Sequence, residues 1–206
     1  MANKEKKFLI VIGRQFGSGG RRIGKEIADR LGIAYYDRKL ITEAARRMGY
    51  APEIFERADE KRPSFLRSLL HLNYGATSSF SPESDMSSEG IYKAQSSVIK
   101  EICSKESCVI VGRTADYVMR DHPNMISIFL HAPMKTRIQN VMAKENIFDS
   151  DQAEDLIRKQ DREREAYYNY FTNRHWGRAD NYHLSVDSTR FDADKIIAAI
   201  SHLLPK

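Results

Sequence analysis

The sequence contains few cysteines and no long apolar run. Its 206 residues include only two cysteines, Cys103 and Cys108, with no second pair at metal-binding spacing, so we expect reduced, at least half-buried thiols. No stretch approaches the roughly 20 apolar residues that span a bilayer. The first apolar run, which ends at Gly13, is too short for a signal peptide. These absences predict a cytoplasmic protein without a membrane partner.

The sequence also lacks a continuous basic run, although its net charge is positive. Lys and Arg number 33 against 28 Asp and Glu, a balance of +5 that favours anionic partners. The arginines are dispersed, with clusters at 21–22, 46–47 and 162–164, whereas a nucleic-acid arm more often combines a basic run with aromatics. Arginines that converge only after folding favour a small phosphorylated ligand, so we do not expect nucleic acid as a partner.

Short apolar runs alternate with amphipathic segments along the chain. With 41% hydrophobic residues, the chain can bury one sizeable core. Continuous apolar runs predict strands, and apolar residues at helical spacing predict helices between them. This alternation predicts an α/β fold whose parallel sheet is covered on both faces and binds ligands beyond the carboxyl ends of its strands. The predicted strands are 8–12, 33–36, 108–111, 125–131 and 182–186.

Helix signals are clearest outside the segment 73–90. That segment is rich in Ser, Gly and Pro, which is typical of a surface linker or of a mobile flap that closes over a substrate. Asp151 and Glu154 have the spacing of a capping box and predict the start of a long polar helix. The predicted helices are 22–31, 39–48, 91–103, one that carries 137–142, 151–168 and 196–204.

A glycine-rich turn joins the first predicted strand to the first predicted helix. Its glycines lie at positions 13, 17, 19, 20 and 24. They allow positive φ angles and let backbone N–H groups approach an anion at the positive end of the helix dipole. The same glycines are compatible with a plain tight turn. A Rossmann dinucleotide site is disfavoured because its third glycine would be Arg22.

The turn departs from a regular Walker A motif. Gly-x-x-x-x-Gly-Lys-Ser/Thr would place its first glycine at Arg14, its lysine at Gly20 and its hydroxyl at Arg21. The charge of the lysine would then have to come from Arg14, Arg21 or Arg22, because a guanidinium is permanently cationic and matches phosphate oxygens bidentately. The sequence does not decide among these three arginines.

Five motifs occur together along the chain. They are Gln15-Phe16-Gly17-Ser18-Gly19-Gly20 with Ile23-Gly24, Tyr35-Tyr36-Asp37, Val109-Ile110-Val111-Gly112-Arg113, Asp161-Arg162-Glu163-Arg164 with Tyr167-Tyr168, and Asn181-Tyr182-His183-Leu184 before Asp187-Ser188-Thr189. Together they resemble the cytidylate kinase-like family almost from end to end, most weakly between 51 and 90. The resemblance implies a three-layer P-loop NTPase fold in one domain over 1–206, with a five-stranded parallel sheet flanked by helices. It also implies a helical, mobile monophosphate-binding insert at about 50–95 and a lid at about 160–180.

The same resemblance implies a kinase that uses ATP and magnesium to phosphorylate CMP, dCMP or another nucleoside monophosphate. Gly112-Arg113 resembles a strand-end arginine that meets the acceptor nucleotide, and Arg162 and Arg164 resemble lid arginines. The acid that usually follows the strand-end arginine is here Thr114. Gly17, Ser18 and Gly19 resemble the phosphate cradle, and the expected donor site comprises Arg14, Gln15, Gly17, Ser18, Gly19, Gly20, Arg21 and Arg22.

Position along the chain leaves alternatives for several of these side chains. Arg113 follows a strand at the edge where a crevice forms, but a structural ion pair is the alternative. Arg162 and Arg164 suit closure over phosphates and, equally, solvated positions on a helix. Asp37 is assigned to the acceptor site, where it would orient ribose or a magnesium-bound water, with a helix N-cap as the alternative. Arg137 is expected at the surface, with reach toward the lid region as the alternative, and no side chain is assigned as a metal ligand.

The function expected from these features is that of an ATP-dependent phosphotransferase. Arg113, Arg162 and Arg164 are its expected catalytic residues, because phosphoryl transfer needs positioning and cationic stabilisation rather than covalent help. The altered Walker A motif favours one alternative, a catalytically degenerate, nucleotide-binding regulatory module with the same fold. The sequence does not indicate an oligomeric state.

Overall fold

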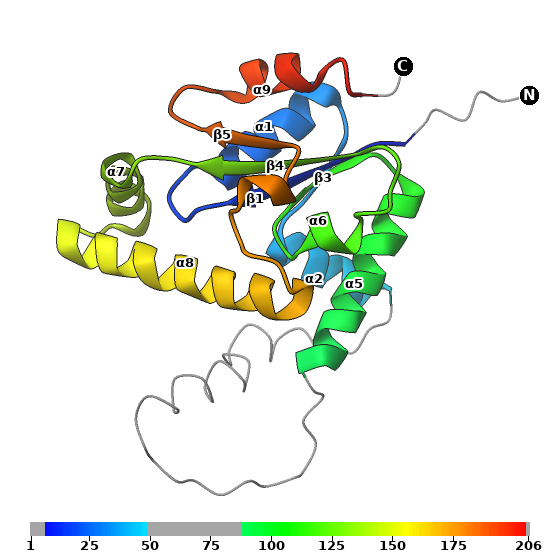
Figure 1. The fold of residues 1–206 in the computed structure, drawn as a ribbon, viewed down its shortest axis with the longest axis horizontal. Coiled ribbons are helices and arrows are strands. Elements are labelled where there is room, and N and C mark those ends of the chain that lie inside the picture. The colour runs from blue at the N-terminus through cyan, green and yellow to red at the C-terminus, as the bar shows by residue number, and fades with distance from the viewer. Residues whose placement is uncertain (1–6, 49–87, 205–206) are drawn as a thin grey trace, which may run out of the picture. The chain divides into compact units, whose positions relative to one another are not determined.

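The structure confirms a five-stranded parallel sheet flanked by helices (Figure 1). It is a computed structural model that describes residues 7–48 and 88–204. The strands are β1 (Leu9–Arg14), β2 (Ala34–Tyr36), β3 (Cys108–Val111), β4 (Met125–His131) and β5 (Leu184–Asp187), in the order β2-β3-β1-β4-β5 across the sheet. The described helices are α1 (Gly20–Leu31), α2 (Arg38–Arg47), α5 (Ser88–Lys105), α6 (Ala115–Val118), α7 (Met134–Glu145), α8 (Ser150–Thr172), the 3-10 helix η1 (Ala179–Asn181) and α9 (Ala193–Ile200).

Strand β1 lies in the centre of the sheet. Its first four residues, 9–12, are all buried, as expected for a strand covered on both faces. It pairs in parallel with β3 on one side and with β4 on the other, and the pairing with β4 continues through Gly13 and Arg14. The strand is therefore two residues longer at its carboxyl end than predicted, and Arg14 is its last residue.

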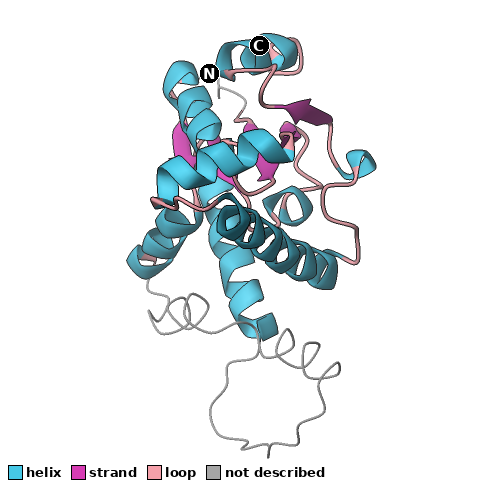
Figure 2. Cartoon of the chain, turned by 90° about the vertical axis from the view of Figure 1, so that its left-hand side faces the viewer, coloured by secondary structure: helices cyan, strands magenta, loops and turns pink. Residues whose placement is uncertain are grey.

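Helices α1 and α9 cover one face of the sheet. Ile23 and Ile27 of α1 and Ile196 of α9 pack into one buried apolar cluster with side chains of β1, β3, β4 and β5. Gly24 lets α1 approach closely, because a Cβ atom there would lie 2.8 Å from Val111 Cγ2. Figure 2 shows strands with helices on two sides.

Helices α6 and α8 lie toward the opposite face of the sheet (Figure 1), where several aromatic rings contact one another. Phe129 of β4 packs edge-on against Trp176, with 5.4 Å between ring centroids, and its ring is tilted by 40° against that of Tyr182 at 5.0 Å. A Cβ atom on Gly13 would lie 2.9 Å from the Phe129 ring, so this layer depends on the glycine. The Tyr168 hydroxyl of α8 donates to Asp116 of α6 at 2.7 Å.

Helix α8 begins differently from the prediction. Its N-cap is Asp149, whose carboxylate accepts hydrogen bonds from the N–H groups of Asp151 and Gln152. The predicted capping box of Asp151 and Glu154 is therefore wrong, because an acidic residue two positions earlier already satisfies the free amides. The two short helices α6 and η1 were not predicted, since one helical turn leaves too few residues for a period.

The chain divides into two compact units, residues 1–38 with 100–206, and residues 39–99. The first unit contains the complete sheet and the candidate site described below. Of the second unit, the structure describes 39–48 and 88–99, which belong to α2 and α5. The predicted insert at about 50–95 falls largely outside the described residues and stays a prediction. Within 7–48 and 88–204, no helix is long and apolar enough to cross a membrane.

Candidate phosphate-binding site

Three neighbouring strands end at the same edge of the sheet and bring the expected site residues together. β1 ends at Arg14, β2 is followed by Asp37, and β3 is followed by Gly112 and Arg113. Because the strands are parallel, these four positions share the carboxyl edge, where ligands of α/β proteins bind.

The loop from β1 to α1 leaves the amino end of α1 uncapped by side chains. Gly17 and Gly19 both have φ +79°, a conformation that favours glycine. Gly19 is the N-cap of α1, no side chain in the described part of the chain caps the helix, and its first turn has no acidic residue. Free amides at the positive end of a helix dipole suit an anion such as phosphate.

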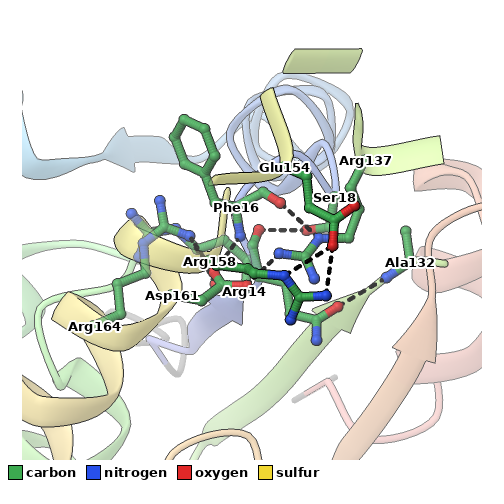
Figure 3. A network of polar contacts seen from close by, with 10 residues as sticks. Arg14, Phe16, Ser18, Ala132, Arg137, Glu154, Arg158, Asp161 and Arg164 are labelled. Atoms are coloured by element: carbon green, nitrogen blue, oxygen red, sulfur yellow. Dashed lines mark hydrogen bonds and ion pairs between the residues drawn. The ribbon is translucent and has the colours of Figure 1, made fainter. Parts of the chain in front are cut away.

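A buried ion pair holds the backbone of this loop in place (Figure 3). Asp161 of α8 accepts a hydrogen bond from Phe16 N at 2.8 Å, and Arg137 of α7 donates from Nε to Phe16 O at 2.8 Å. The two side chains also pair with each other, and Arg137 is only 4% exposed. The expectation that Arg137 is a surface charge is therefore wrong. Asn140 adds a further bond to Gly17 O at 2.8 Å.

The polar side chains within the loop are used to build it. Ser18 is buried, and its hydroxyl donates to Gln15 O at 2.9 Å. The Gln15 side chain accepts from Ala132 N at 3.2 Å, which ties the loop to the end of β4. These contacts position the backbone amides, so the loop presents main-chain donors to a ligand.

Several arginines crowd the same edge. Burial, followed by the charges of Arg164, Arg21 and Arg113, lowers the pKa of Arg14 to about 9. Burial also lowers the pKa of Arg38, and Arg113 and Arg21 add to that shift. A guanidinium keeps its proton at physiological pH, so these shifts express the free-energy cost of burying the charges and, second, of holding like charges together. A bound anion would offset that cost.

Arg164 belongs to this group, whereas Arg162 lies apart from it. Arg164 donates to Arg14 O at 3.0 Å and stacks over the Phe16 ring at 5.2 Å. Burial lowers its pKa to about 10, with Asp161 opposing the shift and Arg21 adding to it. Arg162, two residues away on α8, is exposed. Its predicted role in a lid stays a prediction.

Arg113 lies in a strained segment. Gly112, Arg113 and Thr114 have successive positive φ angles of 83°, 62° and 52°. Such angles are uncommon for residues with side chains, above all for a β-branched one, and tend to mark functional positions. Burial lowers the pKa of Arg113, while Tyr167, which is also its hydrogen-bond partner, and Asp37 oppose the shift.

Arg21 and Arg22 have carboxylate partners. Arg21 Nε lies 3.8 Å from Asp37 Oδ2, and Arg22 Nη1 lies 2.8 Å from Glu26 Oε1 one turn along α1. Burial, and then the charge of Asp37, raise the pKa of Tyr35 to about 12. Asp37 thus stands next to the arginine that replaces the magnesium-binding hydroxyl of a regular motif.

A pocket of about 380 Å³ lies beside the loop at the carboxyl ends of β4 and β5. Gln15 connects it to the phosphate-binding loop. The other lining residues are Phe129, His131, Ala132, Pro133, Gly177, Ser185 and Asp187. Among the residues that the structure describes, no group of three or more His, Cys, Asp or Glu side chains could hold a metal ion.

Arg137 and Asp161 are the site residues that the sequence reasoning missed as a pair. A signal for both exists in the helical spacing. Arg137 lies four positions before the buried Val141, and Asp161 lies four after the buried Ile157, so each charge falls on an apolar helix face. Charged residues on such faces are rarely buried without a partner, and the two faces pack on each other.

The comparisons with known proteins agree with this geometry. Residues 9–190 match the profile of a family described as the cytidylate kinase-like family. A cytidylate kinase of Methanosarcina barkeri is 28% identical over 185 residues, which cover 88% of this chain and 87% of the relative. A crystal structure from Eubacterium ventriosum has a TM-score of 0.69 at 27% identity, covering 95% of this chain and 97% of that one. A gluconokinase from Sinorhizobium meliloti, at 14% identity and a TM-score of 0.55 over 97% of this chain and 95% of its own, is alike in fold alone.

Proposed function

The chain belongs to the cytidylate kinase-like family, and from this membership we propose that it transfers the γ-phosphoryl group of ATP to a nucleoside monophosphate such as CMP or dCMP. The observation that carries the proposal is the convergence of Arg14, Arg21, Arg113 and Arg164 beside an uncapped helix end. The transition state of phosphoryl transfer spreads negative charge over several oxygens. Fixed cations and amides directed at that charge are the main catalytic device this reaction needs.

The proposed donor site is the loop from Arg14 to Arg22. Main-chain amides of the loop and of the first turn of α1 would bind the β- and γ-phosphates. The pocket next to Gln15 has room for an aromatic base and adjoins the loop, which supports it as the place of the adenine.

The proposed acceptor site lies on the other side of the loop, toward β2 and β3. Arg113 and Arg38 are cationic there, and Asp37 accompanies them. Arg113 would bind the phosphate of the monophosphate, and Asp37 would orient its ribose. Arg164 would cover the transferred group from α8 and keep water out, whereas the lid role of Arg162 stays a prediction.

Magnesium would arrive bound to ATP, because this ion usually keeps several waters and binds proteins through one or two carboxylates plus substrate phosphates. It would neutralise charge on the β- and γ-phosphates. Asp37 would accept hydrogen bonds from the waters of the magnesium ion, because its carboxylate lies 3.8 Å from Arg21, which stands at the Ser/Thr position of a regular Walker A motif. The acceptor's identity and a cytoplasmic location stay predictions.

The test is an assay of the purified full chain with ATP and Mg²⁺ against CMP, dCMP, UMP, AMP and GMP. We expect ADP formation that depends on the acceptor, with the highest kcat/KM for a cytosine nucleotide. If no monophosphate raises ADP above the ATP-only background, the proposed activity is wrong. Tight ATP binding by calorimetry without any transfer would then favour the regulatory module, which the substitutions at Gly20 and Arg21 motivate.

A further inference from the structure

One side chain fills the space that a Walker lysine would need. Arg14 is the last residue of β1, and Gly20 is the first residue of α1. A Cβ atom on Gly20 would lie 2.7 Å from both Cβ and Cγ of Arg14. A lysine at position 20 and an arginine at position 14 therefore exclude each other.

The far end of the same side chain crosses a second glycine. A Cβ atom on Gly112 would collide with Nη1 of Arg14. Gly112 also has φ +83°, a backbone conformation that favours glycine, and its lack of a side chain leaves room for the guanidinium in its observed position. The guanidinium thus lies between the phosphate-binding loop and the strand end that carries Arg113, which is where the proposed donor and acceptor phosphates would meet.

The other two candidates for the lysine's charge are held elsewhere. Arg22 is exposed and pairs with Glu26 along α1, and Arg21 is directed to Asp37. Burial lowers the pKa of Arg14 most, and the neighbouring charges that lower it further are those of Arg164, Arg21 and Arg113. A bound anion would stabilise a cation in this position.

We propose that Arg14 replaces the Walker lysine as the cation on the terminal phosphates of the nucleotide, and that glycine at 20 and 112 makes room for it. The inference rests on the proposed function for the identity of the anion. An arginine reaches across from the strand end, whereas a lysine would reach back from the first residue of the helix. The guanidinium also offers two parallel donors to phosphate oxygens where an ammonium offers a point charge.

The test exchanges the two residues. R14G should lower kcat/KM by about 100-fold, the typical effect of losing one preorganised donor. R14Q, which keeps Cβ and Cγ beside Gly20 but removes the guanidinium, should do the same while the far-UV spectrum stays that of the wild type. The double variant R14G/G20K removes the obstacle and supplies a lysine, so it should recover at least about tenfold over R14G. R30Q, which breaks the exposed pair between Arg30 of α1 and Asp194 of α9, is the matched control.

Binding of inorganic tripolyphosphate by calorimetry separates this inference from the proposed function. We expect R14Q to weaken it at least about tenfold and R30Q to leave it within twofold. If the wild type phosphorylates no acceptor but R14Q still loses tripolyphosphate binding, the kinase proposal fails and the role of Arg14 stands. If the wild type is active and R14Q matches R30Q in both readouts, the role of Arg14 is refuted and the kinase proposal stands.

Discussion

Replacing Asp161 with asparagine tests whether the buried ion pair holds the phosphate-binding loop. The change keeps the size of the side chain and an oxygen that can accept from Phe16 N. It removes the charge opposite Arg137, whose side chain is 5% exposed and whose Nε donates to Phe16 O. An amide also places N–H donors opposite the donors of the guanidinium.

The expected cost follows from the burial of the two partners. Removing one partner of a fully buried pair costs about 3–5 kcal/mol, because the other charge stays buried and uncompensated. The Asp161 side chain is 17% exposed, so solvent screens part of this. We therefore expect D161N to lower the free energy of unfolding by about 2–4 kcal/mol. In a chain of this length, that corresponds to a fall in Tm of roughly 5–15 °C.

The assay is urea unfolding followed by far-UV circular dichroism, with E154Q as the control. Glu154 is on the same helix and pairs with Arg158 at 2.8 Å, but the two side chains are 34% and 55% exposed. The same carboxylate-to-amide change there should cost under about 0.5 kcal/mol. Equal losses in D161N and E154Q would refute the reasoning, and so would strictly additive effects of D161N and R137Q, since contacting partners should couple.

Two further predictions concern Asp116 and Gly17. Burial raises the pKa of Asp116, and the hydrogen bond from Tyr168 opposes this shift. The contribution of Asp116 to the free energy of unfolding is therefore complete below the unfolded pKa of about 3.9, and it is lost as pH rises through the folded pKa. In urea unfolding, the free energy of unfolding of D116N relative to that of the wild type should therefore increase from pH 4 to pH 8. A difference between the two proteins that does not change with pH would contradict this. G17A places a Cβ atom 2.8 Å from Arg137 O at φ +79°, whereas G32A, at φ +65°, meets nothing within 4 Å. Thermal unfolding should show G17A less stable than G32A by about 1–3 kcal/mol, and equal Tm values would show that the loop tolerates the atom.

The sequence by itself determined the sheet and most of its helices. Strand β3 and strand β4 have the predicted bounds, because a continuous apolar run between turn residues is a local property. The glycine-rich turn and the expected family were likewise readable from neighbouring residues, and the family match confirms the latter. The exact ends of β1 and the cap of α8 were not, since they depend on pairing and on competition between nearby acids.

Tertiary structure alone decided how the charged residues are distributed between scaffold and site. Arg137 and Asp161 are 24 residues apart and became a buried pair only because α7 and α8 pack on each other. Arg14, Arg21 and Arg22 were equivalent in the sequence, and the room beside Gly20 and Gly112 distinguishes Arg14. The physical reason is distance along the chain. Periodicity and turn chemistry depend on residues a few positions apart, whereas packing and charge pairing depend on surfaces that meet only after the strands have aligned.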